Sequence, residues 1–367
     1  MNIPIFKPQN ELNQIKDLHQ KIQKLLDSGV FIGGNYVETL EDNLKKFLGM
    51  KYISTLNSGS DALYFSLKAL NLKKNDEVII PSFTYYATLS SVLRVGAKPV
   101  FADIENNSFC ISLATLNKVV TSQTRCIIPV NLFGYSPDMN NIKDFANKNE
   151  IYIVEDNAQG FGSRDFDGQL LGTFGEINAF SNYPSKILGG IGDGGFVATN
   201  DKNYFSNINI YKNQGQNKPY NHVQIGYNSR LDSINALVLN EKLKIFSSIE
   251  KSRNKFKTFY ENLFKDYEIV ETFNTKSKNT LLNYFTLVLP SEIRDSFQKK
   301  LFDLNIQSTV YYKKPLHMQP VIKSATNNLS NTELISKKVL SLPFYSFPDE
   351  DDLSYLEESI TKVIKSF

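Results

Sequence analysis

The sequence contains few of the residues on which metal, thiol and histidine chemistry depend. It has no tryptophan, two cysteines (Cys110 and Cys126) and three histidines (His19, His222 and His317) in 367 residues. None of these cysteines and histidines has the spacing of metal ligands, so we expect no metal site. With so few histidines, a Ser-His-Asp or Cys-His hydrolase is a disfavoured interpretation.

Long apolar runs and concentrated charge are also absent. No run of about 18 apolar residues occurs, which predicts no transmembrane helix. The N-terminus, MNIPIFKPQNEL, has neither the basic start nor the apolar stretch of a secretory signal. The formal net charge is +3 and the basic residues are dispersed, which disfavours a nucleic-acid-binding role. We expect a cytoplasmic protein that binds neither membranes nor nucleic acid.

Short apolar segments alternate with helical patterns over the first 200 residues. The length of the chain suggests about two domains. Amphipathic helices are predicted at 9–28 and 36–48, and further helices near 60–71, 85–95, 112–119 and 138–148. Strands are predicted at 52–56, 77–80, 98–102, 125–130, 151–154, 177–181 and 195–199. This alternation is typical of an α/β fold with a mostly parallel sheet covered on both faces.

The second part of the sequence predicts a smaller α+β unit. A helical pattern without proline or glycine runs from Asp232 to Phe264 and bridges into it. Strands at 267–271, 283–289 and 307–311, a helix near 291–304 and two terminal helices follow, with a polar surface loop at 273–280. We expect a large domain at 1–245 and a small domain at 246–367.

Ligands of open parallel sheets bind beyond the carboxyl ends of the strands, so the residues that follow each strand matter most. The sequence NSGSDA (57–62) follows the first predicted strand and opens a helix, where free N–H groups and the hydroxyl of Ser60 suit an anion. The alternative is a simple helix cap. Glu155 and Asp156 follow the strand predicted at 151–154. Because strand side chains alternate, one carboxylate should face the cleft and the other should be solvated or cap the next element.

The segment SNYPSK (181–186) and its glycine-rich continuation have two interpretations. Gly190, Gly192 and Gly195 match the dinucleotide pattern GxGxxG, but that pattern requires a following helix, and residues 196–199 read as a strand. The second interpretation is a pyridoxal phosphate (PLP) site. Such a site needs a lysine for the imine, a carboxylate for the pyridine nitrogen and hydroxyl and N–H groups for the phosphate. Lys186, Asp156 and Ser60 supply this set jointly, although any single lysine is most often a surface residue.

Eight ordered segments resemble one protein family. They are NSGSDAL (57–63), DEVIIPSFTYYAT (76–88), GAKPVFADIE (96–105), VNLFGYSPDM (130–139), VEDNAQGFG (154–162), SNYPSKILGGIGDGG (181–195), GYNSRL (226–231) and PLHMQP (315–320). In this order they resemble the PLP-dependent nucleotide-sugar aminotransferases of the DegT/DnrJ/EryC1/StrS family. The resemblance implies the aspartate-aminotransferase-like fold (PLP fold type I), with a large, mostly parallel sheet domain and a small C-terminal α+β domain.

The resemblance implies roles for four residues around the cofactor ring. Lys186 matches the lysine that forms the imine, and Asp156 matches the carboxylate that pairs with the pyridine nitrogen. Gln159 matches the amide beside the ring hydroxyl, and Tyr85 occupies the position of the aromatic residue that stacks on the ring.

Further residues are implied for the phosphate and the substrate. Ser60, the backbone N–H of Asp61 and Ser181 match phosphate contacts. Asn228 matches a contact donated by the second subunit, which implies a homodimer with shared active sites. Substrate contacts are expected in the segment that contains Tyr312, Lys313, Lys314 and His317. Several asparagines depart from the common family pattern, which weakens inference about the sugar: Asn131, Asn157, Asn182 and Asn235.

The implied activity is transfer of an amino group from an amino acid, expected to be L-glutamate, to C3 or C4 of a nucleotide-linked keto-deoxysugar. This activity serves amino-sugar and polysaccharide biosynthesis. Relatives that dehydrate sugars carry histidine in place of Lys186, so dehydration is disfavoured. Two alternatives remain: an enzyme of the same family that acts on a non-nucleotide cyclic ketone, and a non-catalytic regulator that binds PLP.

Overall fold

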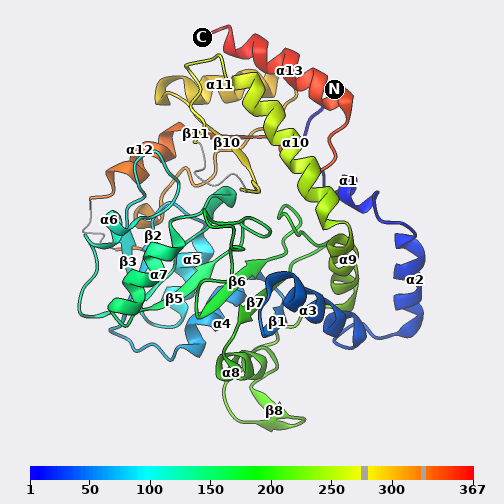
Figure 1. Cartoon of the computed structure of the whole chain (residues 1–367), viewed down its shortest axis with the longest axis vertical. Coiled ribbons are helices and arrows are strands. Elements are labelled where there is room, and N and C mark those ends of the chain that lie inside the picture. Colours follow the sequence, from blue (N-terminus) through cyan, green and yellow to red (C-terminus); the bar gives the residue numbers. More distant parts are fainter. Residues whose placement is uncertain (274–279, 324–327) are drawn as a thin grey trace.

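The computed structural model describes residues 1–273, 280–323 and 328–367, and a seven-stranded sheet lies at its centre (Figure 1). The strands lie in the order β1-β7-β6-β5-β4-β2-β3, and β7 runs antiparallel to both of its neighbours while the other pairs are parallel. The predicted α/β fold is confirmed. The strands are β1 (Tyr52–Leu56), β2 (Glu77–Pro81), β3 (Lys98–Ala102), β4 (Thr124–Ile127), β5 (Tyr152–Asp156), β6 (Ile177–Ser181) and β7 (Gly195–Thr199).

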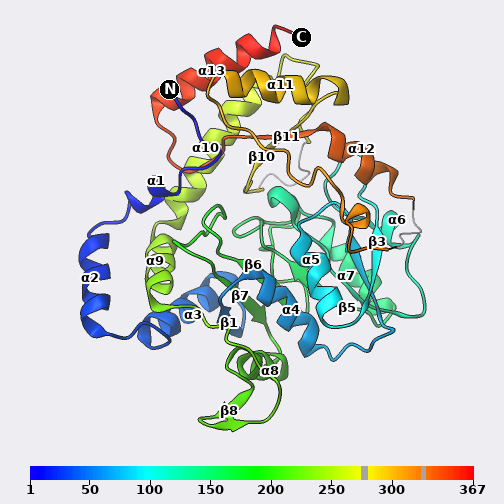
Figure 2. The same cartoon turned by 180° about the vertical axis from the view of Figure 1, so that it is seen from behind.

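Helices cover both faces because successive strand side chains point to opposite sides. In β2, Val78 and Ile80 pack in the cluster that contains α4 (Gly59–Ala69) and α5 (Tyr86–Arg94), whereas Ile79 packs with α7 (Met139–Lys148). Figure 2 shows α4 and α5 lying across one face of the sheet. The other helices of this part are α3 (Asn35–Leu48), the short α6 (Leu113–Leu116), α8 (Lys202–Lys212) and α9 (Ser233–Lys244).

Two helices predicted as continuous are interrupted. The helix predicted at 9–28 is divided into α1 (Pro8–Leu12) and α2 (Leu18–Ser28), with Asp17 at a left-handed φ of 57°. The break does not interrupt the buried side of this segment. Ile15, in the connecting turn, is buried as the apolar spacing of the sequence predicts. The helix predicted from Asp232 to Phe264 is divided at Ile245 into α9 and α10 (Phe246–Phe264).

A second apolar core lies around α10 and the C-terminal elements. These elements are β10 (Phe285–Val288), α11 (Ser291–Asp303), β11 (Val339–Leu342) and α13 (Glu350–Ile364). Two further elements pack elsewhere: Leu316 of a 3-10 helix at Leu316–Met318 lies in the core of α4 and α5, and Ile335 of α12 (Ser330–Lys338) lies in the cluster around Phe133. Ile3 joins the second core through a bridge to Ile306, so the N-terminus packs on the C-terminal unit. The boundary between residues 245 and 246 stays a prediction.

Some predictions for the C-terminal unit are wrong. The strands expected at 267–271 and 307–311 are single bridges, at Glu271 and Thr309, because the sheet here consists of β10 and β11 alone. In the large unit, the helix expected at 112–119 is likewise too long, since it is only the single turn α6. The polar loop expected at 273–280 falls mostly on residues 274–279, which lie outside the described part.

A small hairpin, β8 (Gln216–Lys218) and β9 (Asn221–His222), projects from the body of the molecule (Figure 1). No strand was predicted there, since these residues are polar and show no alternation of apolar side chains. In the part of the chain that the structure describes, no helix has the length and apolar character needed to cross a bilayer.

The turn at Leu132–Gly134 joins the two units. The backbone N–H of Asn283 donates to the carbonyl of Phe133 at 2.8 Å. Gly134 has a φ of +100°, and a Cβ there would collide with the main-chain oxygen of Leu281 and lie 2.9 Å from Leu282 Cα. Only glycine tolerates both this backbone conformation and this close approach.

Gly134→Ala should therefore lower the free energy of unfolding by about 2–4 kcal/mol, because left-handed strain and overpacking add. Gly96→Ala is the matched control: Gly96 has a φ of +78°, but nothing lies within 4 Å of a Cβ there. Gly96→Ala should therefore lower the free energy of unfolding only by the backbone strain, about 1–2 kcal/mol. Thermal unfolding of both variants checks this, and equal destabilisation would contradict the proposed close contact at Gly134.

Candidate active site

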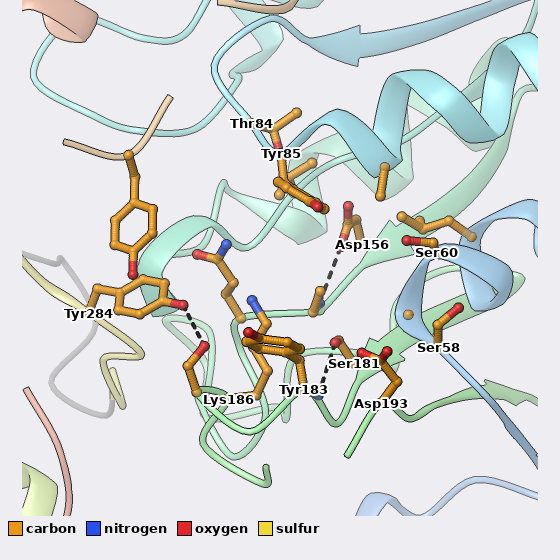
Figure 3. A pocket seen from close by; sticks show the side chains of 18 of the residues that line it. Ser58, Ser60, Thr84, Tyr85, Asp156, Ser181, Tyr183, Lys186, Asp193 and Tyr284 are labelled. Atoms are coloured by element: carbon orange, nitrogen blue, oxygen red, sulfur yellow. Dashed lines mark hydrogen bonds between the residues drawn. The ribbon is translucent and has the colours of Figure 1, made fainter. Parts of the chain in front are cut away.

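A cavity of about 480 Å³ lies at the carboxyl ends of the strands. Its walls include residues that follow or end four strands: Ser58 after β1, Thr84 after β2, Asp156 in β5 and Ser181 in β6. Figure 3 shows Ser58 and Ser60 at one end, Tyr284 at the other, and Lys186 and Asp156 between them. The fold thus gathers most of the predicted site residues in one place.

Lys186 lines this cavity from the loop between β6 and β7. Two asparagine side chains bond the main chain of the loop: Asn182 Nδ2 donates to the carbonyl of Leu188 at 2.9 Å, and Asn235 Nδ2 donates to that of Asp193 at 2.8 Å. These two bonds restrain the backbone of the loop that carries Lys186. The strand β7 follows it, which confirms that the glycine pattern here is not a dinucleotide fingerprint.

Asp156 lines the same cavity and is 4% exposed. Its Oδ2 accepts a hydrogen bond from Thr88 Oγ1 at 2.9 Å, and its Oδ1 accepts one from the backbone N–H of Ala158 at 3.2 Å. Burial raises the pKa of Asp156, and the opposing effects of these two bonds and of the Lys186 cation do not cancel it. Burial therefore disfavours the ionised form of Asp156, and a cation bound beside this carboxylate would favour that form again.

Glu155 points to the opposite face of the sheet, as strand alternation predicts. It is neither solvated nor at the cleft: it is fully buried and accepts bonds from the backbone N–H groups of Gly172 (2.6 Å) and Phe174 (3.0 Å) and from Asn131 Nδ2 (2.7 Å). Burial raises its pKa despite these donors. Of the two expectations for this carboxylate, solvation is wrong, whereas its bonds to the backbone N–H groups before β6 resemble the expected cap of the next element.

Gln159 is held in a single orientation. Its Oε1 accepts from the backbone N–H of Phe133 at 2.7 Å, and its Nε2 donates to the hydroxyl of Tyr312 at 2.7 Å. Tyr312 also lines the cavity, and burial raises the pKa of its hydroxyl. The two residues come from different units of the chain, so this bond ties the C-terminal unit to the cavity.

The start of α4 forms the end of the cavity suited to an anion. Ser60 and Ser181 line it, and a Cβ at Gly59 would lie 2.7 Å from Ser181 Cβ, so only glycine permits this approach. Ser58, not Ser60, caps the helix: its Oγ accepts from the N–H of Asp61 at 3.1 Å. The N–H of Asp61 is therefore already bonded, and Asp61 lies outside the cavity lining.

Tyrosines that sequence reasoning missed form the other end. The Tyr284 hydroxyl lies 2.9 Å from Ser185 Oγ, and the Tyr284 ring stacks on that of Tyr311 with centroids 4.5 Å apart. Lys186 Nζ lies 5.8 Å from the Tyr284 ring centroid. Burial alone would raise the pKa of Tyr284, but the Lys186 cation and bonds with Ser185 and Tyr311 lower it overall. No sequence pattern links Tyr284 to Lys186.

Three predicted substrate-loop residues lie outside the cavity lining. Lys313 and Lys314 are exposed. His317 is bonded within the protein: its Nδ1 lies 2.7 Å from Ser82 Oγ and its Nε2 lies 3.3 Å from Glu333 Oε1. His317 therefore fixes the loop that carries Tyr312.

Asn228 also lies outside the cavity of its own chain, and its Oδ1 accepts from Arg230 Nη2 at 2.9 Å. Tyr85 lines the cavity with a ring that is 61% exposed, which leaves it free to stack on a ligand. Phe6, from the N-terminal segment, lines it as well, and its position before the first helix gave no hint of this.

The donor set fits PLP. Asp156 offers a buried carboxylate for the pyridine nitrogen, and Lys186 offers an amine on the same cavity. The N–H of Asp61 is bonded to Ser58, but the N–H groups of Gly59 and Ser60 lie at the very start of α4, where a helix offers no carbonyl partner. With the hydroxyls of Ser60 and Ser181, which line the cavity, they suit a phosphate.

Comparisons with known proteins agree with this chemistry. The chain is 33% identical over 353 residues to the UDP-2-acetamido-2-deoxy-3-oxo-D-glucuronate aminotransferase of Pseudomonas aeruginosa, covering 96% of this chain and 98% of that protein. It is 32% identical over 374 residues to a pleiotropic regulatory protein of Geobacillus stearothermophilus, covering 100% of both.

Solved structures and a family model extend this likeness to the fold. NtdA from Bacillus subtilis, solved with the bound cofactor PMP, matches with a TM-score of 0.91 and 29% identity over 99% of this chain and 85% of that one. The model of the DegT/DnrJ/EryC1/StrS aminotransferase family matches residues 13–361. The chain therefore belongs to this family of PLP-dependent aminotransferases.

Proposed function

We propose that this enzyme moves an amino group from L-glutamate to C3 or C4 of a nucleotide-linked keto-deoxysugar. The observation that carries the proposal is the presence of the Lys186 amine and the buried Asp156 carboxylate on one cavity. The substrate class is supported by the Pseudomonas aeruginosa relative, whose name specifies a UDP-linked 3-oxo sugar.

Bound PLP would supply the electron sink for the carbanion formed at the carbon next to the nitrogen. Lys186 is the residue that would hold the cofactor covalently. Once the amino donor displaces it, Lys186 Nζ is a free amine that can take the proton from the donor α-carbon and deliver it again. Asp156 would keep the pyridine nitrogen protonated, and Tyr85 would stack on the ring.

The mouth of the cavity suits a sugar nucleotide. Tyr85 and Tyr183 offer partly exposed rings on which a sugar can pack. Lys313 and Lys314 follow Tyr312 directly and are exposed, which suits contact with a diphosphate. His317 acts in this proposal by fixing the loop, since Ser82 and Glu333 already engage its ring nitrogens.

Lys186→Ala should abolish formation of amino sugar from L-glutamate and a nucleotide-linked keto sugar, while the fold is kept. Mass spectrometry of the sugar nucleotide after incubation with PLP checks this. Lys313→Ala is the matched control. It should raise KM for the sugar nucleotide and leave kcat nearly unchanged, because in this proposal the Lys313 side chain contacts only the diphosphate. Full turnover by Lys186→Ala would refute the assignment.

The same assay separates the alternatives. The Geobacillus stearothermophilus relative is named a pleiotropic regulatory protein. If this chain were a non-catalytic regulator, it would yield no amino sugar from any acceptor. An enzyme for cyclic ketones would aminate a free cyclic ketone but not the nucleotide-linked sugars.

Asp156→Asn should lower the activity of the enzyme and raise the stability of the cofactor-free protein. Burial raises the pKa of Asp156 in the protein without cofactor, so ionised Asp156 destabilises that state. This destabilisation is absent below the ordinary pKa of about 3.9 and present once the pH exceeds the raised value. Asparagine should therefore stabilise the cofactor-free protein at about pH 7 but not at about pH 4, and should lower kcat on the order of a hundred- to a thousandfold.

Thermal unfolding of both cofactor-free proteins at the two pH values, together with steady-state kinetics, tests this. A variant that gains most stability at acid pH would contradict the electrostatic account of Asp156.

The proposed homodimer with shared active sites predicts complementation between two inactive variants. Lys186→Ala and Asn228→Ala should each be nearly inactive alone. In a hybrid dimer, one site would combine Lys186 of one chain with Asn228 of the other, both intact, so mixing the two variants by co-expression should restore activity. If each site were built from a single chain, every hybrid would stay inactive.

A further inference from the structure

A buried ion pair lies directly behind the loop that carries Lys186. Lys242, in α9, is 1% exposed, and its Nζ lies 2.5 Å from Glu11 Oε2 in α1. The same Nζ donates to the carbonyl of Gly189 at 2.6 Å. Gly189 is three residues beyond Lys186, so the ion pair is attached to the loop of the proposed active site.

The pair continues into the C-terminal unit. Glu11 Oε1 accepts from Ser346 Oγ at 2.7 Å, and Arg253 Nη1, from α10, donates to the same hydroxyl at 3.4 Å. Both Ser346 and Arg253 are buried. Figure 1 shows why these groups can meet: α1, α9 and the start of α10 come together at the junction of the two units.

Arg253 connects the ion pair to the wall of the cavity. Its Nε donates to the carbonyl of Leu282 at 3.1 Å and its Nη2 to that of Asn283 at 2.9 Å. The next residue is Tyr284, whose hydroxyl lies 2.9 Å from Ser185 Oγ, beside Lys186. The bonds therefore form a closed ring that begins and ends on the Lys186 loop.

We define this buried polar ring by its side-chain members, Lys242, Glu11, Ser346, Arg253 and Tyr284. It contains two cations and a single carboxylate, so Glu11 is the counter-ion of both. Burial lowers the pKa of Arg253 to about 10, while Glu11 acts in the opposite direction. Buried charges are costly unless paired and fully bonded, which makes this arrangement rigid.

We propose that Lys242 and Glu11 are positioning residues for the active site. Through Gly189 on one side and Tyr284 on the other, the buried polar ring fixes the loop of Lys186 relative to the tyrosine wall of the cavity. This inference rests on the proposed function in one respect, namely that Lys186 is the amine that binds PLP. Neither residue lines the cavity, so both act through the residues that they hold.

The test uses Lys242→Met in the full-length protein loaded with PLP. Methionine is similar in length and leaves Arg253 and Glu11 as a balanced pair, so the variant should fold. Visible circular dichroism of the bound cofactor is the first readout, because this band depends on the orientation of the ring. We expect the band per bound PLP to weaken and kcat to fall on the order of ten- to a hundredfold, the effect of small misplacement of a reacting group, with KM for glutamate little changed.

Arg294→Met is the matched control. Arg294 is also a buried cation, 4% exposed, and it donates to the carbonyl of Val339 at 3.2 Å, but it lies in α11 away from the cavity. It should lower the melting temperature and leave the cofactor band unchanged. Ser346→Ala is a second, milder variant that opens the ring at its far side and should weaken the band less than Lys242→Met does.

The outcomes are distinct. A weakened band in Lys242→Met and Ser346→Ala, with a normal band in Arg294→Met, supports the positioning role. Wild-type bands in both ring variants, or an equal loss in Arg294→Met, would overturn it while leaving the proposed function intact. If Lys242→Met does not fold, Ser346→Ala alone decides between these results. A wild-type protein that forms no band with PLP would overturn the proposed function and this inference together.

Discussion

The convergence of strand ends at one edge of the sheet is the constraint on which the site depends. β1, β5 and β6 run in the same direction, so the residues that end or follow them meet at one edge, although β1 is far from β5 and β6 in sequence. Strand alternation then sorts the adjacent carboxylates. Asp156 faces the cavity, and Glu155 turns to the opposite face, where it secures a loop. Two neighbouring residues of the same chemistry thus have different roles.

The sequence was informative where local pattern and three-dimensional position coincide. The seven strands of the large sheet were predictable because strands covered by helices on both faces are short, mostly apolar runs. Lys186, Asp156 and Ser60 were accessible for a related reason, since each lies in a segment that ends or follows such a strand, and Gln159 was implied by the family resemblance. Their presence on one cavity agrees with the expectation, while their individual roles stay predictions.

Other features were inaccessible because they depend on contacts between distant segments. Tyr284 and Phe6 line the cavity, but neither lies in a segment whose pattern indicates a site. The break at Ile245 lacks proline and glycine, and it arises where α9 leaves the large core and α10 enters the small one. Asn182 and Asn235 were noted only as departures from a family pattern. The structure gives them a function, since both bond the backbone of the Lys186 loop.

Lys186 and Asp156 are proposed to support transamination of an amino donor by PLP in this cavity. The most direct measurement is the absorbance spectrum of the purified protein with PLP, recorded as L-glutamate is added. The account predicts a yellow band of lysine-bound cofactor that falls as the band of the amine form rises, with 2-oxoglutarate formed in equal amount. A bound cofactor whose spectrum does not respond to glutamate or any other amino acid would contradict it.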